Sequence, residues 1–347
     1  MKIGLGLNPH TLTTENFRFA RQVGVTHIVA HLSNWASATP RPTGPDGQPA
    51  LWSYAELRDL RAAINAEGLD LYALENFEPA HWSDVLLDGP RRDTQIEGLK
   101  TIIRNMGRAG IPVMGYNFSL AGVWGRTQGA FARGGAESTG YIEATAPPQD
   151  PIPHGTIWNT VYDPDAPPGD IGPVSSDQLW SRLEYFLTEL VPVAEEAGVR
   201  LAAHPDDPPL PMLRQTARLV YKPELYQRLL DIVPSHHNAL EFCQGTISEM
   251  VGEMDVYEAI DRYTAQQKIA YVHFRNVRGK VPNYREVFID EGDVDMIRAL
   301  RIYHRNNYDG VITPDHTPNV SCAAPWHAGM AYALGYIRAA ITMIERE

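Results

Sequence analysis

Four short apolar runs in the C-terminal half of the chain decide the fold, and each ends on a residue type that binds metals. The runs are Arg200-Leu-Ala-Ala-His204, Ala239-Leu-Glu-Phe-Cys243, Ile269-Ala-Tyr-Val-His273 and Gly310-Val-Ile-Thr-Pro-Asp315. The four end residues lie 39, 30 and 42 positions apart. Each interval has room for one helix, one strand and two loops, which is the repeat of a βα barrel. Because a closed parallel barrel brings its strand ends to one rim, we expect these four side chains to converge.

The rest of the chain shows the same alternation of strand-like and helical patterns. We predict further strands at residues 2–7, 26–32, 69–76 and 112–118, and helices at residues 14–23, 54–67, 92–109, 178–197, 223–233, 256–264, 294–305 and 328–344. Thr13 or Thr14 can cap the first helix, and Ser176 or Asp177 the helix at 178–197. Eight strands in this order predict an α/β protein with a single (β/α)8 TIM barrel domain over residues 1–347.

Residues 120–175 interrupt the alternation with a stretch that is rich in glycine and proline. Long irregular segments in compact domains are usually functional lids or disordered insertions. Aromatic residues such as Trp124, Phe131 and Trp158 argue against disorder. We therefore expect an ordered insertion after the fourth strand, over the C-terminal rim of the barrel. A contact between subunits is the alternative interpretation, and we expect a homo-oligomer.

Composition excludes several classes of function. The formal net charge of −12 argues against binding to nucleic acid or to an anionic membrane surface. No run approaches the roughly 18 apolar residues of a membrane span. Two cysteines do not make a disulfide framework, and the start of the chain does not resemble a signal peptide. We expect a cytoplasmic protein with a small-molecule substrate.

Taken singly, the four strand-end residues have simpler explanations. A histidine there can be a hydrogen-bonded rim residue, Cys243 a small buried apolar residue, and Asp315 a helix cap. Their conjunction on four consecutive strands favours one divalent transition metal held by His204, Cys243, His273 and Asp315. On ligand chemistry alone Zn²⁺, Fe²⁺ and Mn²⁺ all stay open.

The motifs His204-Pro-Asp-Asp-Pro-Pro209, Cys243-Gln-Gly245, His273-Phe-Arg-Asn-Val277 and Pro314-Asp-His316 resemble the signature of the mannonate dehydratase family, which belongs to the xylose-isomerase-like barrels. The resemblance implies the same four metal ligands, Mn²⁺ or Fe²⁺ as the metal, and His316 as the catalytic histidine. The family also has a catalytic tyrosine after the Asp-His pair. This chain has Ala324-Pro-Trp-His327 there, so we predict His327 as the second proton-transfer residue, with Tyr332 as the alternative.

Dehydration of a sugar acid removes the proton beside the carboxylate and expels the neighbouring hydroxyl group. Arg275 shares a face with His273 in extended geometry and can pair with the substrate carboxylate, unless it forms a structural ion pair. Asn117 and Asn276 can bind substrate hydroxyl groups, although both amides can instead serve loop backbone.

The expected function is therefore that of a metal-dependent lyase in carbohydrate metabolism, which converts D-mannonate to 2-dehydro-3-deoxy-D-gluconate and water as a step of hexuronate catabolism. One alternative is a metal-dependent sugar isomerase or epimerase on the same barrel. The other is a sugar-acid sensor that binds its ligand without turnover.

Overall fold

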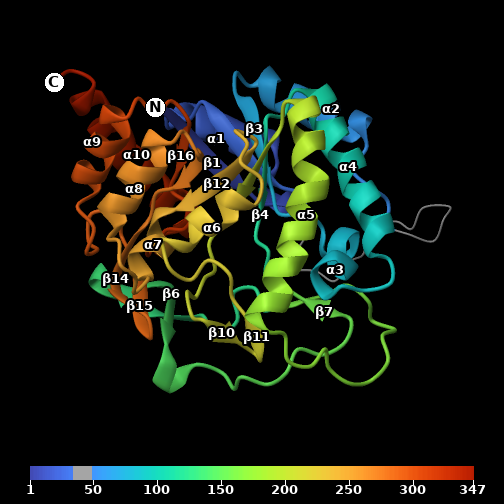
Figure 1. Ribbon diagram of the computed structural model, residues 1–347. Coiled ribbons are helices and arrows are strands. Elements are labelled where there is room, and N and C mark those ends of the chain that lie inside the picture. Colours follow the sequence, from blue (N-terminus) through green and yellow to red (C-terminus); the bar gives the residue numbers. More distant parts are fainter. Residues whose placement is uncertain (34–48) are drawn as a thin grey trace.

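The computed structural model describes residues 1–33 and 49–347, and eight parallel strands close into a barrel at its centre (Figure 1). In chain order the barrel strands are β1 (Lys2–Leu7), β2 (His27–His31), β3 (Asp70–Glu75), β4 (Val113–Tyr116), β9 (Arg200–Ala203), β12 (Asn238–Cys243), β13 (Ile269–His273) and β16 (Val311–Thr313). Each strand pairs with its neighbours in the chain, and β16 closes the ring against β1. The predicted barrel is confirmed.

Helices surround the barrel and connect its strands (Figure 1). They are α1 (Thr14–Gln22), α2 (Tyr54–Ala66), α3 (Pro79–Leu87), α4 (Arg92–Ala109), α5 (Ser176–Ala197), α6 (Leu225–Ile232), α7 (Gln244–Glu249), α8 (Val256–Ala265), α9 (Met296–Arg305) and α10 (Pro325–Ile344). The sequence did not indicate α3 or α7. None of the helices in the described part of the chain is long and apolar enough to cross a membrane.

Side chains that alternate along the barrel strands form two separate cores, one between barrel and helices and one inside the barrel. In β12, Leu240 and Phe242 face the helices, whereas Ala239 points into the barrel with small residues of other strands. Successive side chains of a strand point to opposite faces, so Glu241 and Cys243 also face inward. The polar end of this inward face lies at the carboxyl rim, where a barrel carries its site.

Side-chain caps fix where the helices begin. Thr13 accepts a hydrogen bond from the backbone N–H of Asn16 and so caps α1, as expected. The predicted cap of α5 was wrong: Ser175, not Ser176 or Asp177, forms a capping box with Gln178. Ser176 and Asp177 are the first two residues of α5, so the error concerns only where the helix begins.

Residues 120–175 are less irregular than predicted. They contain β5 (Thr127–Ala132), β6 (Ala136–Ile142), β7 (Thr156–Ile157) and β8 (Thr160–Val161). Strands β5 and β6 join β14 (Asn276–Lys280) and β15 (Asn283–Val287) in a second sheet of order β14-β15-β6-β5. A small hairpin, β10 (Met212–Leu213) and β11 (Thr216–Ala217), forms a β-bridge to Val174 at the end of the segment through Thr216. The insertion is therefore tied to the loop that follows β13.

Candidate active site

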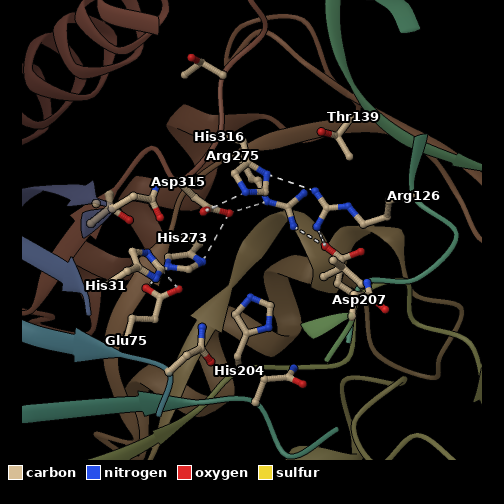
Figure 2. Close-up of a pocket in the computed structure, with 18 of the residues that line it drawn as sticks. His31, Glu75, Arg126, Thr139, His204, Asp207, His273, Arg275, Asp315 and His316 are labelled. Carbon is tan, nitrogen blue, oxygen red and sulfur yellow. Dashed lines mark hydrogen bonds and ion pairs between the residues drawn. The ribbon is translucent and has the colours of Figure 1, made fainter. Parts of the chain in front are cut away.

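A cavity of about 780 Å³ opens at the carboxyl ends of the barrel strands (Figure 2). Strand ends supply His31, Glu75, His204, His273 and Asp315 to its wall. The 120–175 segment supplies another part of the wall, with Val123, Trp124, Gly125, Arg126, Gln128, Thr139, Pro147, Trp158 and Asn159. Insertion and barrel rim thus line one cavity of the size that binds small molecules.

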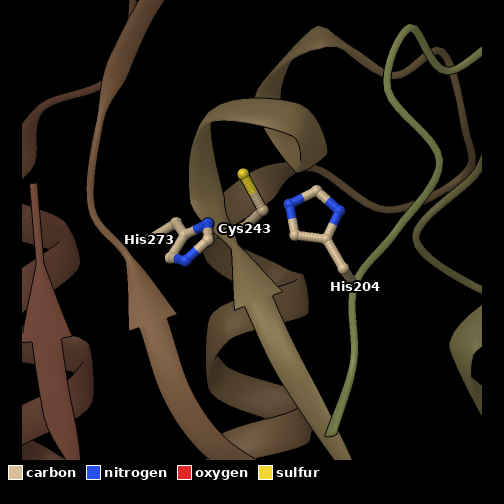
Figure 3. A group of neighbouring side chains, drawn as sticks. All are labelled: His204, Cys243 and His273. Carbon is tan, nitrogen blue, oxygen red and sulfur yellow. The ribbon is translucent and has the colours of Figure 1, made fainter. Parts of the chain in front are cut away.

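Three of the four expected metal ligands meet at this rim. His204 directly follows β9, Cys243 ends β12 and His273 ends β13. One ligand atom from each lies within 4.8 Å of the other two, and Figure 3 shows both imidazoles turned toward the Cys243 sulfur. A sulfur and two imidazole nitrogens at this spacing suit a divalent transition metal.

Hydrogen bonds select which nitrogen of each imidazole faces the centre. Nδ1 of His204 lies 2.6 Å from the Pro205 carbonyl oxygen, which leaves Nε2 for a metal. Nε2 of His273 lies 3.2 Å from Glu75 Oε2, while its buried Nδ1 has no hydrogen-bond partner among the described residues. A buried imidazole nitrogen without a partner is costly unless something else binds it. The site therefore fits a metal ion by its own geometry.

Asp315, the fourth expected ligand, reaches the same cavity because the chain turns sharply after β16. Its φ of 59° lies in the left-handed region, which non-glycine residues adopt rarely. The turn brings both Asp315 and His316 to the cavity wall, although neighbours in a strand would point apart. Asp315 Oδ2 lies 3.5 Å from His273 Nδ1, the nitrogen that faces the centre.

Nearby positive charges favour the anionic forms of Cys243 and Asp315. Burial alone would raise the pKa of the Cys243 thiol, but the positive charges of Arg275 and His204 hold it well below its ordinary value. Burial also opposes ionisation of Asp315, yet His273, His316 and Arg275 together keep the pKa of that carboxyl far below its usual range. Thiolate and carboxylate are the forms that bind metals.

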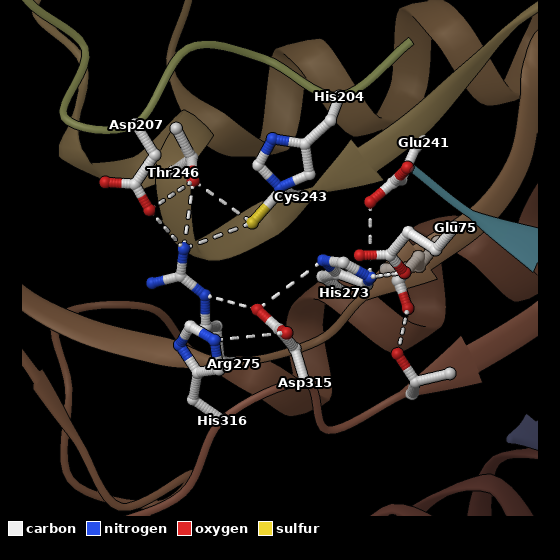
Figure 4. A network of polar contacts seen from close by, with 12 residues as sticks. Glu75, His204, Asp207, Glu241, Cys243, Thr246, His273, Arg275, Asp315 and His316 are labelled. Atoms are coloured by element: carbon white, nitrogen blue, oxygen red, sulfur yellow. Dashed lines mark hydrogen bonds and ion pairs between the residues drawn. The ribbon is translucent and has the colours of Figure 1, made fainter. Parts of the chain in front are cut away.

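Arg275 lies at the centre of a buried ion cluster (Figure 4). Its Nε donates to Asp315 at 2.9 Å, and Nη2 donates to Asp207 at 2.8 Å. Its Nη1 donates to Glu249 at 3.1 Å and to Glu286 at 3.0 Å. All three guanidinium nitrogens are directed at protein groups, which favours the structural ion pair over binding of a substrate carboxylate.

One ring nitrogen of His316 lies near both a carboxylate and a guanidinium. Its Nδ1 lies 3.0 Å from Glu286 Oε2 and 3.3 Å from Arg126 Nη2, which reaches in from the insertion. Burial would lower the pKa of His316, but the carboxylates of Asp315 and Glu286 raise it above its ordinary value. Glu286 can accept the Nδ1 proton, which leaves Nε2 as a base.

The other predicted residues separate into two groups. Asn117 lines the cavity. Its amide nitrogen donates to the Pro205 carbonyl oxygen, and its amide oxygen accepts from the Trp158 indole N–H. Asn276 does not line it, because its amide holds the backbone at Ile289 and Val294. His327 lies in the first turn of α10 and contacts α1, with Nε2 3.0 Å from Asn16 Oδ1, and it does not line the cavity either.

The sequence reasoning missed two buried glutamates beside His273, Glu75 and Glu241. Glu75 ends β3 at the rim, so the strand-end rule applied to the ligands would have found it. Glu241 follows from the alternation in β12, two residues before Cys243. Burial raises the pKa of Glu241 to about 8, with a further contribution from Glu75. Burial also acts to raise the pKa of Glu75, but His31 and His273 lower it to about 2.

Comparison with known proteins agrees with this geometry. The model of the D-mannonate dehydratase (UxuA) family matches residues 8–158 and 170–343. Mannonate dehydratase of Streptococcus pneumoniae (strain 70585) is 30% identical over 282 residues, which cover 78% of this chain and 75% of the relative. The crystal structure of mannonate dehydratase from Streptococcus suis serotype 2 superposes with a TM-score of 0.81 and 26% identity, covering 100% of this chain and 94% of that one.

A more distant structure agrees in fold alone. The xylose isomerase domain protein from Planctomyces limnophilus has a TM-score of 0.60 and 13% identity, over 99% of each chain. The expected xylose-isomerase-like barrel is thereby confirmed. With its matching family model, a relative at 30% identity and a strand-end cluster of metal-binding residues, the chain belongs to the D-mannonate dehydratase (UxuA) family of hydro-lyases.

Proposed function

We propose that the protein dehydrates D-mannonate to 2-dehydro-3-deoxy-D-gluconate in a reaction that depends on one divalent metal ion. The observation that carries the proposal is the cluster of His204, Cys243 and His273, because both of its histidines line the same cavity as His316. A histidine that is oriented by a carboxylate can transfer protons, which catalysis needs and ligand binding alone does not.

His204, Cys243, His273 and Asp315 would hold the metal, for which we propose Mn²⁺ or Fe²⁺ from the family resemblance. When bound, such an ion stabilises negative charge that develops on the oxygens of the substrate carboxylate and neighbouring hydroxyl group. Its four ligands come from four strand ends, so the rigid barrel sets the position of the substrate.

His316 performs the proton transfer in this proposal. Its Nε2 accepts the proton from C2, and the electrons of that C–H bond form the C2–C3 double bond. The C3 oxygen leaves with the electrons of the C–O bond and receives the proton from His316 to form water. The remaining enol then tautomerises to the 2-keto-3-deoxy acid, so all atoms and electrons balance.

Neutral polar groups on the cavity wall fit the hydroxyl groups of a sugar acid. Asn117, Gln128, Thr139 and Asn159 all line the cavity, and three of them belong to the 120–175 segment. We propose that this segment covers the bound substrate and excludes water, which strengthens the charge interactions at the site.

Incubating metal-loaded protein with a panel of aldonic acids and weighing the products tests the reaction. We expect a product lighter than D-mannonate by one water molecule, with the reactivity of a 2-keto-3-deoxy acid. A product of unchanged mass would assign the protein to the isomerase or epimerase class. Tight binding of an aldonic acid without any product would favour the sensor.

Replacing Cys243 by serine tests the metal site. A serine hydroxyl is a much poorer ligand for these ions than a thiolate, so the purified variant should contain far less metal than the unchanged protein. Elemental analysis after dialysis gives the metal content of both. Cys322→Ser is the matched control, because that cysteine is exposed and lies outside the cluster. Equal metal content in the Cys243 variant and the control would remove Cys243 from the site.

A further inference from the structure

A buried carboxylate lies directly behind the proposed metal site. Glu75 ends β3, and its side chain contacts the metal-site residue His273 through Nε2 at 3.2 Å. The Tyr271 hydroxyl donates to the same Glu75 oxygen at 3.2 Å and fixes its position. His31 lies on the other side of Glu75, at 3.6 Å, which is beyond a normal hydrogen bond.

A second carboxylate competes for the same imidazole nitrogen. Glu241 Oε1 lies 3.4 Å from Nε2 of His273, and the residue is completely buried. Neither of its carboxylate oxygens makes a hydrogen bond to any described residue. The two glutamates thus lie at nearly the same distance from His273 Nε2, but only Glu75 has the geometry of a hydrogen bond to it.

The barrel makes room for this polar layer with a glycine. A Cβ placed on Gly115 of β4 would collide with the Tyr271 hydroxyl and with a Glu241 carboxylate oxygen. Glycine lets the two carboxylates and the tyrosine occupy the barrel interior at that level. The backbone at Gly115 is therefore matched to the side chains of Glu75, Glu241 and Tyr271.

We propose that Glu75 is the positioning residue of the metal site: by accepting the Nε2 proton of His273, it fixes Nδ1 as the atom that binds the metal. The inference rests on the proposed metal-dependent function. Carboxylates that hold a histidine ligand in this way set its ring orientation and its basicity, and their removal typically lowers metal affinity by about 10- to 100-fold. Glu241 lacks this geometry and should contribute little.

Two matched variants test the proposal, Glu75→Gln and Glu241→Gln. Each replaces one buried carboxyl group next to the same imidazole nitrogen with an amide and keeps the shape of the side chain. Isothermal titration of the metal-free proteins with Mn²⁺ should show a Kd raised about 10- to 100-fold for Glu75→Gln. The Kd for Glu241→Gln and for His31→Gln should stay close to that of the unchanged protein.

The visible absorption spectrum with Co²⁺ gives a readout that does not depend on activity. It reports the geometry around the ion, so Glu75→Gln should shift its bands while Glu241→Gln should not. Thermal unfolding of the metal-free forms shows whether each variant is folded. If Glu75→Gln does not fold, Glu75→Asp replaces it, because the shorter carboxylate no longer reaches Nε2.

The outcomes separate this inference from the proposed function. An unchanged protein that binds Mn²⁺ and a Glu75→Gln variant that binds it equally well would overturn the role of Glu75 alone. Equal losses in both glutamine variants would also overturn it, since any carboxyl group beside His273, and not the hydrogen bond from Glu75, would then set the affinity for the metal. Failure of the unchanged protein to bind any divalent metal would overturn the metal-dependent function itself.

Discussion

Replacing His316 by asparagine should lower kcat by at least about 100-fold, because a positioned acid or base contributes roughly 10²- to 10⁴-fold to the rate. Asparagine has a similar size and polarity but cannot exchange a proton near neutral pH. Because His316 is not one of the four proposed ligands, the variant should keep its metal. Steady-state kinetics with D-mannonate and elemental analysis of the same preparation measure both quantities.

His327→Asn is the matched control for this experiment. His327 lies outside the cavity, where it contacts Asn16 and the ring of Phe19, so this change should leave kcat nearly unaltered. The family resemblance led to the opposite expectation for His327. Full activity in His316→Asn would refute the proposed proton transfer, and an inactive His327→Asn would restore the prediction from the sequence.

Replacing Arg275 by methionine should destabilise the protein by roughly 3–5 kcal/mol, the usual cost of removing one partner from a buried ion pair. Methionine fills most of the space but leaves Asp207, Glu249, Glu286 and Asp315 without their common cation. Urea unfolding followed by circular dichroism measures the change in the free energy of unfolding.

Arg278→Met serves as the comparison for Arg275. Arg278 is three positions further along the chain, and its exposed side chain pairs with Glu291 at 3.4 Å. Exposed pairs contribute about 1 kcal/mol or less, so its loss should be small. If Arg275→Met instead unfolds like the unchanged protein and only raises KM, then Arg275 binds the substrate carboxylate, as the sequence suggested.

The barrel was predictable because its signals are local. Apolar runs, helix periodicity and glycine at helix ends such as Gly110 and Gly198 each act over a few residues. The strand-end rule also placed His204, Cys243 and His273 together, since a parallel barrel leaves strand ends only one rim to reach.

The second sheet and the surroundings of His316 were not predictable from the sequence. Strand β6 pairs with β15 about 140 residues away, and neither run is apolar enough to indicate a strand alone. Arg126 approaches His316 across 190 residues of chain. Asn276 belongs to the His273 motif, yet its amide donates to the backbone carbonyl of Ile289 and does not line the cavity. Strand β14 begins at this residue.

Four prolines between residues 33 and 51 predict a loop there. Residues 34–48 of this segment lie outside the described part of the chain. The neighbouring Ser53 begins α2 with a complete capping box, in agreement with the helix predicted at 54–67.

Closure of the ring by β16 has a consequence for how the protein matures on the ribosome. This strand is the last of the eight to be synthesised, and it pairs with the first strand of the chain, β1, as well as with β13. It also carries Asp315 to the rim. Such a distant pairing is slow to form, because the chain must lose much entropy before the contact is made. Because Asp315 reaches the rim only when β16 pairs, a newly made chain would bind the ion at full affinity only after its barrel has closed.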